Sequence, residues 1–228
     1  MTANAISIIR KAYAQLHESL KSAAEQLESE FKAIDDGAIA KSKKATVFIL
    51  TWMREYYVFQ KQFDTLFNRS VMQPAADQFT AVVALTLHRY LASRGADHVV
   101  KSEVNLEHRR GTLRPDISVW RHGTELAATI ECKTNLGYNR DGWSKQYYER
   151  TKRIEMMSKG CLSFLCVLTK ENWEKSWPEF SKSNLAGNRW FCLSDVWPSE
   201  LSGDLTTHII HPIEPMLVGI RKHLEVPA

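Results

Sequence analysis

Apolar positions along the 228-residue chain follow two patterns, one typical of helices and one typical of buried strands. From residue 75 onward, segments with apolar residues at three- and four-residue spacing alternate with short, nearly continuous apolar runs. The helical pattern predicts helices at residues 75–94, 139–159, 171–182 and 212–224. The short runs predict strands at residues 97–106, 114–120, 126–134, 161–169 and 189–193. Strands interleaved with helices predict an α/β (mixed α+β) fold, with a central mixed sheet covered on both sides.

The first 70 residues show a different, seven-residue period. Two sets of apolar positions recur every seven residues, as in a coiled-coil seam: Ile6, Tyr13, Leu20, Leu27 and Ile34 in one set, and Ile9, Leu16 and Ala23 in the other. Asp35-Asp36-Gly37 ends this helix, and a basic linker leads to a second predicted helix at 46–69. The pattern predicts a helical hairpin arm at 1–70 beside a core at 71–228. Two interpretations stay open, because the seam can join two copies of the chain or pack within one.

The segments around residues 116 and 131 predict a β-hairpin with one polar and one apolar face. His122-Gly123 is a turn signal, and a two-residue turn there would pair Asp116 with Thr129. Side chains alternate along a strand, and directly paired residues share a face. The polar face therefore carries Asp116, Thr129, Glu131 and Lys133. The apolar face carries Ile117, Val119, Ala128, Ile130 and Cys132. A loop of odd length would change the pairing of Asp116 but not the common face of Glu131 and Lys133.

Two carboxylates and an amine on one face suggest a metal site with a catalytic lysine. Asp116 and Glu131 would repel each other at close range unless a cation lies between them. Mg²⁺ uses one or two carboxylates together with waters and phosphate oxygens, and Mn²⁺ accepts the same octahedral geometry. A lysine beside such an ion can orient a water and neutralise charge that builds on a phosphate. The alternative is an ion pair on a solvated hairpin face.

The residues Pro115-Asp116 and Glu131-Cys132-Lys133 resemble the signature of the PD-(D/E)xK nuclease superfamily, which includes many type II restriction endonucleases. The resemblance covers about residues 75–195. It implies a restriction-endonuclease-like core and Mg²⁺-dependent hydrolysis of DNA phosphodiester bonds. It further implies that Asp116, Glu131 and the Cys132 carbonyl are metal ligands and that Lys133 activates a water.

Three flanking residues are further candidates on the strength of the same resemblance. Members of the superfamily often carry an acid on the helix before the sheet, and Asp77 in the predicted helix 75–94 is the best match, as a metal ligand and catalytic residue. Glu103 on the first predicted strand is the rival acid. Gln146, on the helix after Lys133, is similar to a glutamine that some branches place near the phosphate. Each also has an ordinary interpretation, as a surface residue or, for Asp77, as a complement to the helix dipole.

Cations around the motif are the predicted DNA contacts. They are Arg109, Arg110, Arg140, Lys145 and Arg150. The resemblance implies a homodimer that cuts both strands of a palindromic duplex. The seven-residue period makes the arm at 1–70 a candidate dimerisation or DNA-gripping element. A cognate methyltransferase would belong to such a restriction system. Two alternatives stay open, a repair, recombination or phage-type nuclease of the same superfamily and a non-catalytic DNA-binding or assembly module.

Composition narrows the setting but does not identify the function. The chain is 44% hydrophobic and 25% charged, with a formal net charge of +4 and a pI near 8.8, values typical of a globular protein and permissive for nucleic acid. No membrane span or signal peptide is evident, so a cytoplasmic location is expected. The four cysteines form no Cys-x-x-Cys pair, which favours buried reduced thiols over a zinc site.

Overall fold

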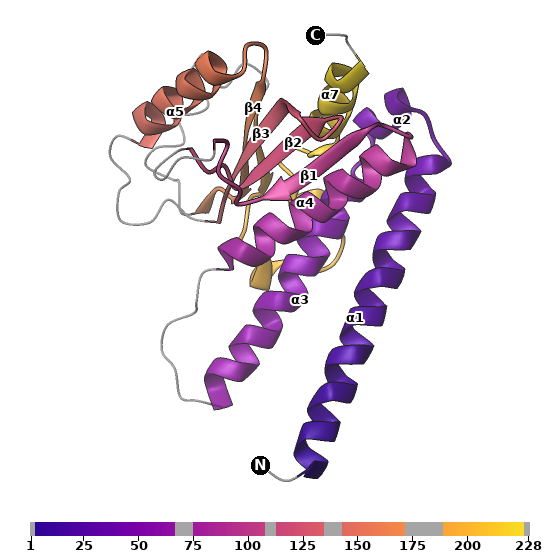
Figure 1. The fold of residues 1–228 in the computed structure, drawn as a ribbon. Coiled ribbons are helices and arrows are strands. Elements are labelled where there is room, and N and C mark those ends of the chain that lie inside the picture. The colour runs from indigo at the N-terminus through magenta and orange to yellow at the C-terminus, as the bar shows by residue number, and fades with distance from the viewer. Residues whose placement is uncertain (1–2, 67–74, 108–112, 135–142, 172–188, 226–228) are drawn as a thin grey trace.

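The computed structural model describes residues 3–66, 75–107, 113–134, 143–171 and 189–225. It is a five-stranded mixed sheet with helices on both faces (Figure 1), so the predicted mixed α+β architecture is confirmed. The helices are α1 (Ala3–Lys32), α2 (Asp36–Lys41), α3 (Lys44–Leu66), α4 (Ala76–Ser93), α5 (Trp143–Met157) and α7 (Glu214–Glu225), with 3₁₀ turns at Pro198–Glu200 and Leu205–His208. The strands are β1 (His98–Ser102), β2 (Ile117–Arg121), β3 (Glu125–Lys133), β4 (Leu162–Thr169) and β5 (Trp190–Ser194).

The strands lie in sequence order across the sheet. β1, β2 and β3 are antiparallel neighbours, whereas β3, β4 and β5 run parallel. A parallel neighbour requires a crossover, and α5 provides it between β3 and β4 on one face. On the other face lie α3, α4 and α7 (Figure 1). β3 is therefore the central strand, with a hairpin on one side of it and a crossover on the other.

Element bounds differ from the predicted ones in a few places. The predicted strand 97–106 ends at Ser102, because Glu103 takes a left-handed backbone conformation with φ of 50° that no strand accommodates. The final helix begins at Glu214, two residues later than predicted. The predicted helix 171–182 falls almost entirely outside the described residues.

The hairpin joining β2 and β3 has a longer turn and a different register than predicted. Arg121 pairs with Glu125, so three residues form the turn where two were expected. A β-bulge then adds Ala127 to β3, and beyond it Ser118 pairs with Thr129. The predicted pairing of Asp116 with Thr129 is wrong by two residues. The longer turn and the bulge each shift the pairing by one residue, and a total shift of two residues leaves each side chain on its predicted face. Continuing the register therefore places Asp116 opposite Glu131 on the same face.

The main hydrophobic cluster lies between the sheet and the helices α3, α4 and α7. All five residues predicted for the apolar hairpin face belong to it: Ile117, Val119, Ala128, Ile130 and Cys132. Helix α4 contributes a broad buried face that includes Phe79, Val83 and Leu87, as its apolar spacing predicted. The cluster continues without a break into α1 and α3 of the N-terminal segment.

The C-terminal third of α1 packs within its own chain. Leu27, from the predicted seam, is buried, but its buried neighbours are Ala24 and Phe31, whereas the seam residue Ala23 is only partly buried. The T-shaped contact of Phe31 with Tyr90 joins α1 to α4, with ring centroids 5.3 Å apart. This part of the seam therefore supports the interpretation in which the seam packs within one chain. The side chains of the first four seam residues, at positions 6, 9, 13 and 16, are not among those described.

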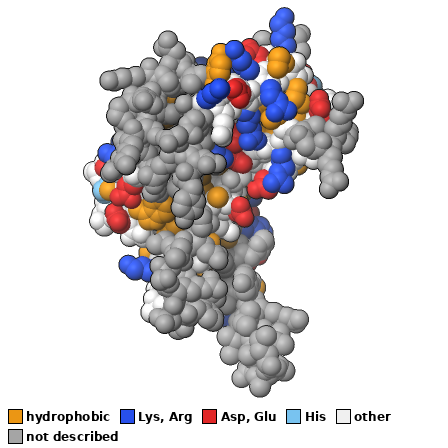
Figure 2. Space-filling model, turned by 90° about the vertical axis from the view of Figure 1, so that its left-hand side faces the viewer, with side chains coloured by type: hydrophobic (Ala, Val, Ile, Leu, Met, Phe, Trp, Pro, Cys, Tyr) orange, Lys and Arg blue, Asp and Glu red, His pale blue; other side chains and the backbone are white. Residues whose placement is uncertain are grey.

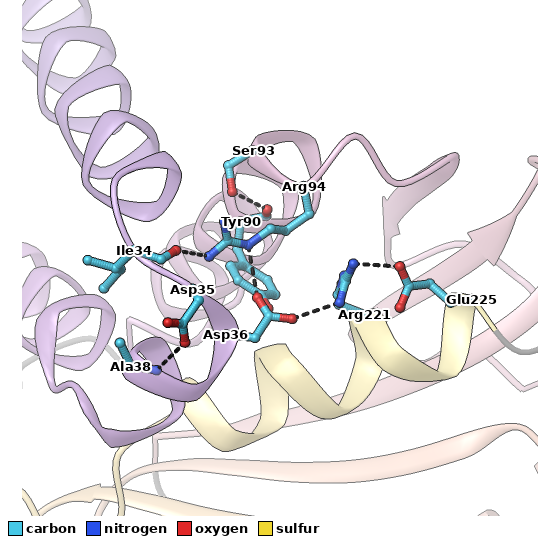
Figure 3. Close-up of polar contacts among 9 residues, drawn as sticks. All are labelled: Ile34, Asp35, Asp36, Ala38, Tyr90, Ser93, Arg94, Arg221 and Glu225. Atoms are coloured by element: carbon cyan, nitrogen blue, oxygen red, sulfur yellow. Dashed lines mark hydrogen bonds and ion pairs between the residues drawn. The ribbon is translucent and has the colours of Figure 1, made fainter.

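Asp36 ties the short helix α2 to two other helices (Figure 3). Its carboxylate accepts a hydrogen bond from the Tyr90 hydroxyl at 2.8 Å and pairs with Arg94 Nε at 2.9 Å, both at the end of α4. Its second oxygen pairs with Arg221 Nη1 of α7, also at 2.9 Å. One carboxylate thus fixes the corner where the chain turns from α1 toward α3.

The N-termini of α3 and α7 cap each other through Thr46 and Glu214. Glu214 is fully buried, and its carboxylate accepts hydrogen bonds from the Thr46 amide at 3.1 Å and the Thr46 hydroxyl at 2.7 Å. The same hydroxyl accepts a hydrogen bond from the Ile213 amide at 2.8 Å. Each side chain therefore satisfies donors at the start of the other helix, which would otherwise lack partners.

Candidate functional site

Asp116 is held at the start of β2 by the strands on either side. Its carbonyl accepts a hydrogen bond from the Glu103 amide at 3.0 Å, just after β1. Its carboxylate oxygen Oδ2 accepts a hydrogen bond from the Cys132 amide of β3 at 2.7 Å. The side chain is therefore fixed in orientation while remaining partly exposed.

Glu131 and Lys133 reach Asp116 from the neighbouring strand. Lys133 Nζ lies 3.2 Å from Asp116 Oδ2 and 3.3 Å from Glu131 Oε2, so one ammonium bridges two carboxylates. Glu131 is buried, with 7% of its side chain exposed, whereas 29% of the Lys133 side chain is exposed. The predicted cluster of Asp116, Glu131 and Lys133 is thus present as a single contact group.

A second cation reaches the same cluster from α5. Arg150 Nη2 lies 2.9 Å from Glu131 Oε1 and also donates to the Arg114 carbonyl, two residues before Asp116. The contact with Glu131 is an ion pair without good hydrogen-bond geometry: within the described part of the chain, Glu131 Oε1 and Arg150 Nε have no hydrogen-bond partner. This carboxylate oxygen is therefore held by an ion pair but satisfied by no hydrogen bond among the described residues.

The charges in the cluster shift each other's pKa values. Burial raises the pKa of Glu131 above its ordinary value, and the negative charge of Asp116 raises it further, with partial opposition from Arg150 and Lys133. Burial alone would lower the pKa of Lys133, but the carboxylates of Glu131 and Asp116 outweigh it and the pKa is raised. In this arrangement Lys133 is therefore an ammonium that donates hydrogen bonds.

An open hollow of about 170 Å³ lies beside the cluster. Its polar lining comes from four parts of the fold: Asp77, Thr80, Glu103, Asp116, Lys133 and Thr134. Asp77 lies in the first turn of α4, and Glu103 lies just after β1. The structure brings both rival acids to the hollow and does not choose between them. Glu103 has a cation beside it, since Arg114 Nη2 lies 3.6 Å from its carboxylate.

The donor set fits a hard divalent cation better than a thiophilic one. Asp116 and Glu131 supply oxygen ligands, and Glu131 Oε1 is a buried oxygen that lacks a hydrogen-bond partner in the described residues. Mg²⁺ needs only one or two such carboxylates, because waters complete its shell. The described residues contain no preformed group of three or more His, Cys, Asp or Glu side chains that could hold a metal. The Cys132 thiol packs in the apolar cluster, so only its backbone belongs to this site.

The remaining predicted residues are less closely tied to the cluster. Gln146 and Lys145 are exposed on α5, and Lys145 Nζ lies 4.0 Å from Glu149. Arg109, Arg110 and Arg140 fall outside the described residues. Acidic and basic side chains intermix over the upper part of the face shown in Figure 2. Of the predicted DNA contacts that the structure describes, only Arg150 touches the cluster.

Sequence patterns did not predict that Arg150 pairs with Glu131, nor that Arg114 both accepts a hydrogen bond from Arg150 and approaches Glu103. The only available signal was the position of Arg150 one helical turn beyond Gln146.

Comparisons of the chain with protein-family models, with curated proteins and with solved structures found no match. The resemblance to the nuclease superfamily therefore rests on the motif residues themselves. None of the helices that the structure describes has the length and apolar character needed to cross a membrane.

Proposed function

We propose that this chain is a metal-dependent DNA endonuclease of the PD-(D/E)xK superfamily, most similar to the type II restriction endonucleases. One observation carries the proposal. Asp116 and Glu131, from adjacent strands, lie on either side of the Lys133 ammonium, next to a hollow with two further carboxylates. Four acids thus gather at one place, and three of them, Asp116, Glu131 and Glu103, are paired there with the cations Lys133, Arg150 and Arg114.

The mixed sheet supports the same proposal. The motif residues lie at the start of β2 and on β3, after helix α4 and strand β1. The resemblance implies this order, since in the superfamily a helix precedes three strands and the motif lies on the second and third of them. Helix α5 and two parallel strands follow. A restriction-endonuclease-like fold is therefore part of the proposal.

Each residue has a role in this proposal. Asp116 and Glu131 hold Mg²⁺, or Mn²⁺ in its place, with Asp77 or Glu103 as an additional acid across the hollow. The bound cation supplies Lewis acidity and lowers the pKa of water. Lys133 donates hydrogen bonds toward the hollow, where it orients the attacking water and neutralises charge on a phosphate oxygen. The Cys132 amide fixes the carboxylate of Asp116.

The proposed substrate is double-stranded DNA, and the proposed assembly is a homodimer in which each subunit cuts one strand of a palindromic site. A cytoplasmic location and a cognate methyltransferase follow from a restriction role. A repair, recombination or phage-type nuclease would use the same cluster on a different substrate. A non-catalytic module would have no need for the ammonium between two carboxylates.

Incubation with phage DNA and Mg²⁺ tests the function directly. Discrete fragments would support site-specific cutting, and a smear would favour the nonspecific nuclease. Asp116→Asn should abolish cleavage, whereas Glu155→Gln, which neutralises an exposed carboxylate on α5, should leave it unchanged. Intact DNA with both Mg²⁺ and Mn²⁺ would refute the nuclease and favour the binding module.

A further inference from the structure

Arg150 occupies the oxygen of Glu131 that Lys133 does not contact. Its Nη2 lies 2.9 Å from Glu131 Oε1, and Lys133 lies 3.3 Å from Oε2. Asp116 and Glu131 carry two negative charges, and Lys133 and Arg150 carry two positive ones. The four side chains are balanced, so a divalent cation that joined them would create an excess of positive charge. Because Glu131 is buried, water screens that excess only in part, and moving a cation or adding an anion would relieve it.

Arg150 is the cation better placed to move. Its link to Glu131 lacks hydrogen-bond geometry, and its Nε has no hydrogen-bond partner among the described residues. Its side chain is 30% exposed, so the guanidinium lies at the boundary between the cluster and solvent. Lys133, by contrast, contacts both carboxylates and sits on the central strand β3. A guanidinium is also the group that binds phosphate oxygens with two parallel hydrogen bonds.

We propose that Arg150 exchanges Glu131 for a backbone phosphate of the substrate when a divalent cation binds at Asp116 and Glu131. The inference rests on the proposed nuclease function and adds a coupling to it. Without the cation, Arg150 neutralises Glu131 and is withheld from DNA. With the cation, the freed guanidinium becomes a phosphate contact beside the hollow. Arg150 and the cation compete for one carboxylate oxygen, and the phosphate favours the cation-bound arrangement.

Competition fixes the direction in which the metal affinity of an Arg150 variant should change. Removing a cationic side chain from the site should strengthen Mn²⁺ binding, because Glu131 Oε1 no longer has to be released from Arg150. Calorimetric titration of Mn²⁺ alone into Arg150→Ala should give a Kd about fivefold or more below that of the wild type. Arg153→Ala removes an exposed arginine from the same helix and is the matched control, which should bind Mn²⁺ as the wild type does. All variants are titrated at one pH, because metal affinity depends on the protonation of the carboxylate ligands.

A merely structural role for Arg150 predicts the opposite sign. Loss of an anchor between α5 and the Arg114 carbonyl would loosen the site and weaken Mn²⁺ binding. Arg150→Gln preserves much of the side-chain length and serves as the second variant if Arg150→Ala does not fold. It should also bind Mn²⁺ more tightly than the wild type.

A second experiment measures the coupling between cation binding and DNA binding. Ca²⁺ should raise the affinity of the wild type for duplex DNA, and this gain should shrink about fivefold or more in Arg150→Ala. If the wild type binds Mn²⁺ and Arg150→Ala binds it equally or more weakly, the exchange is refuted and the nuclease proposal survives. If Mn²⁺ binding is tighter in Arg150→Ala but the wild type never cuts DNA, the exchange at Glu131 stands and the nuclease is refuted. If the wild type binds no Mn²⁺, both proposals fail.

Discussion

Two buried glutamates in this fold have the same side chain and opposite surroundings. Glu214 lies at the start of α7, where its oxygens accept hydrogen bonds from the amide and hydroxyl of Thr46. Glu131 lies on β3, where its oxygens face the side-chain cations Lys133 and Arg150. Burial is the main cause that raises the pKa of each.

The difference lies in what supplies the donors. The donors to Glu214 are a backbone amide and a short side chain whose positions the helix termini fix, so they come with the fold and cannot be exchanged. The donors to Glu131 are the ends of two long side chains, and one of them leaves a carboxylate oxygen without hydrogen-bond geometry. A buried acid whose donors are fixed by helix termini holds two helices together, whereas one faced by long cationic side chains can exchange a partner for a ligand.

The largest expected effect is the loss of cleavage when a site carboxylate is neutralised. Glu131→Gln should lower kcat by about a thousandfold or more, because an oxygen ligand and its charge are lost together. Thermal unfolding should show a Tm equal to or above that of the wild type, since a buried charge is removed. Lys133→Ala should likewise abolish cleavage and leave the fold intact. Glu131→Gln activity near that of the wild type would place the site elsewhere.

Glu214→Gln should show the reverse pattern, with a loss of stability and no loss of cleavage. The amide keeps the shape of the carboxylate but places its NH₂ group against one of the donors from Thr46. We expect the free energy of unfolding to fall by about 1–3 kcal/mol in urea titration. Cleavage per folded molecule should be unchanged. A Glu214→Gln protein as stable as the wild type would contradict the role of the reciprocal cap.

The smallest expected effect concerns pH. A carboxyl whose pKa is raised on folding binds more protons in the folded state, so its contribution to stability falls as pH rises above its unfolded value of 4.5. Glu131→Gln should therefore flatten the decline in Tm above that pH. If the curves of Tm against pH run parallel for the wild type and Glu131→Gln, folding does not raise the pKa of Glu131.

The sequence anticipated the parts of the site that depend on strand periodicity. Glu131 and Lys133 share a face because they are two residues apart on one strand, and that holds in any register. The predicted pairing of Asp116 is wrong, because the turn includes Thr124 as well as His122-Gly123 and the bulge at Ala127 leaves no clear sequence signal. The turn and the bulge each shift the pairing by one residue, and the resulting shift of two residues leaves Asp116 on the predicted face.

The periodicity of apolar and polar residues could not predict contacts between elements that are distant in sequence. Arg150 meets Glu131 only because the crossover through α5 brings that turn of helix over β3. The seven-residue period of α1 anticipated burial of Leu27 but not of Phe31. A heptad describes two helices wound about one seam, whereas the end of α1 packs on α4 with different contacts.

The paired turn and bulge have a consequence for how this hairpin can change in length during evolution. Removing one turn residue alone would place Asp116 on the apolar face, and removing Ala127 alone would do the same. Either deletion separates Asp116 from Glu131, although neither touches a residue of the cluster. Related chains should therefore vary at these two places together, with a two-residue turn accompanied by a strand without the bulge.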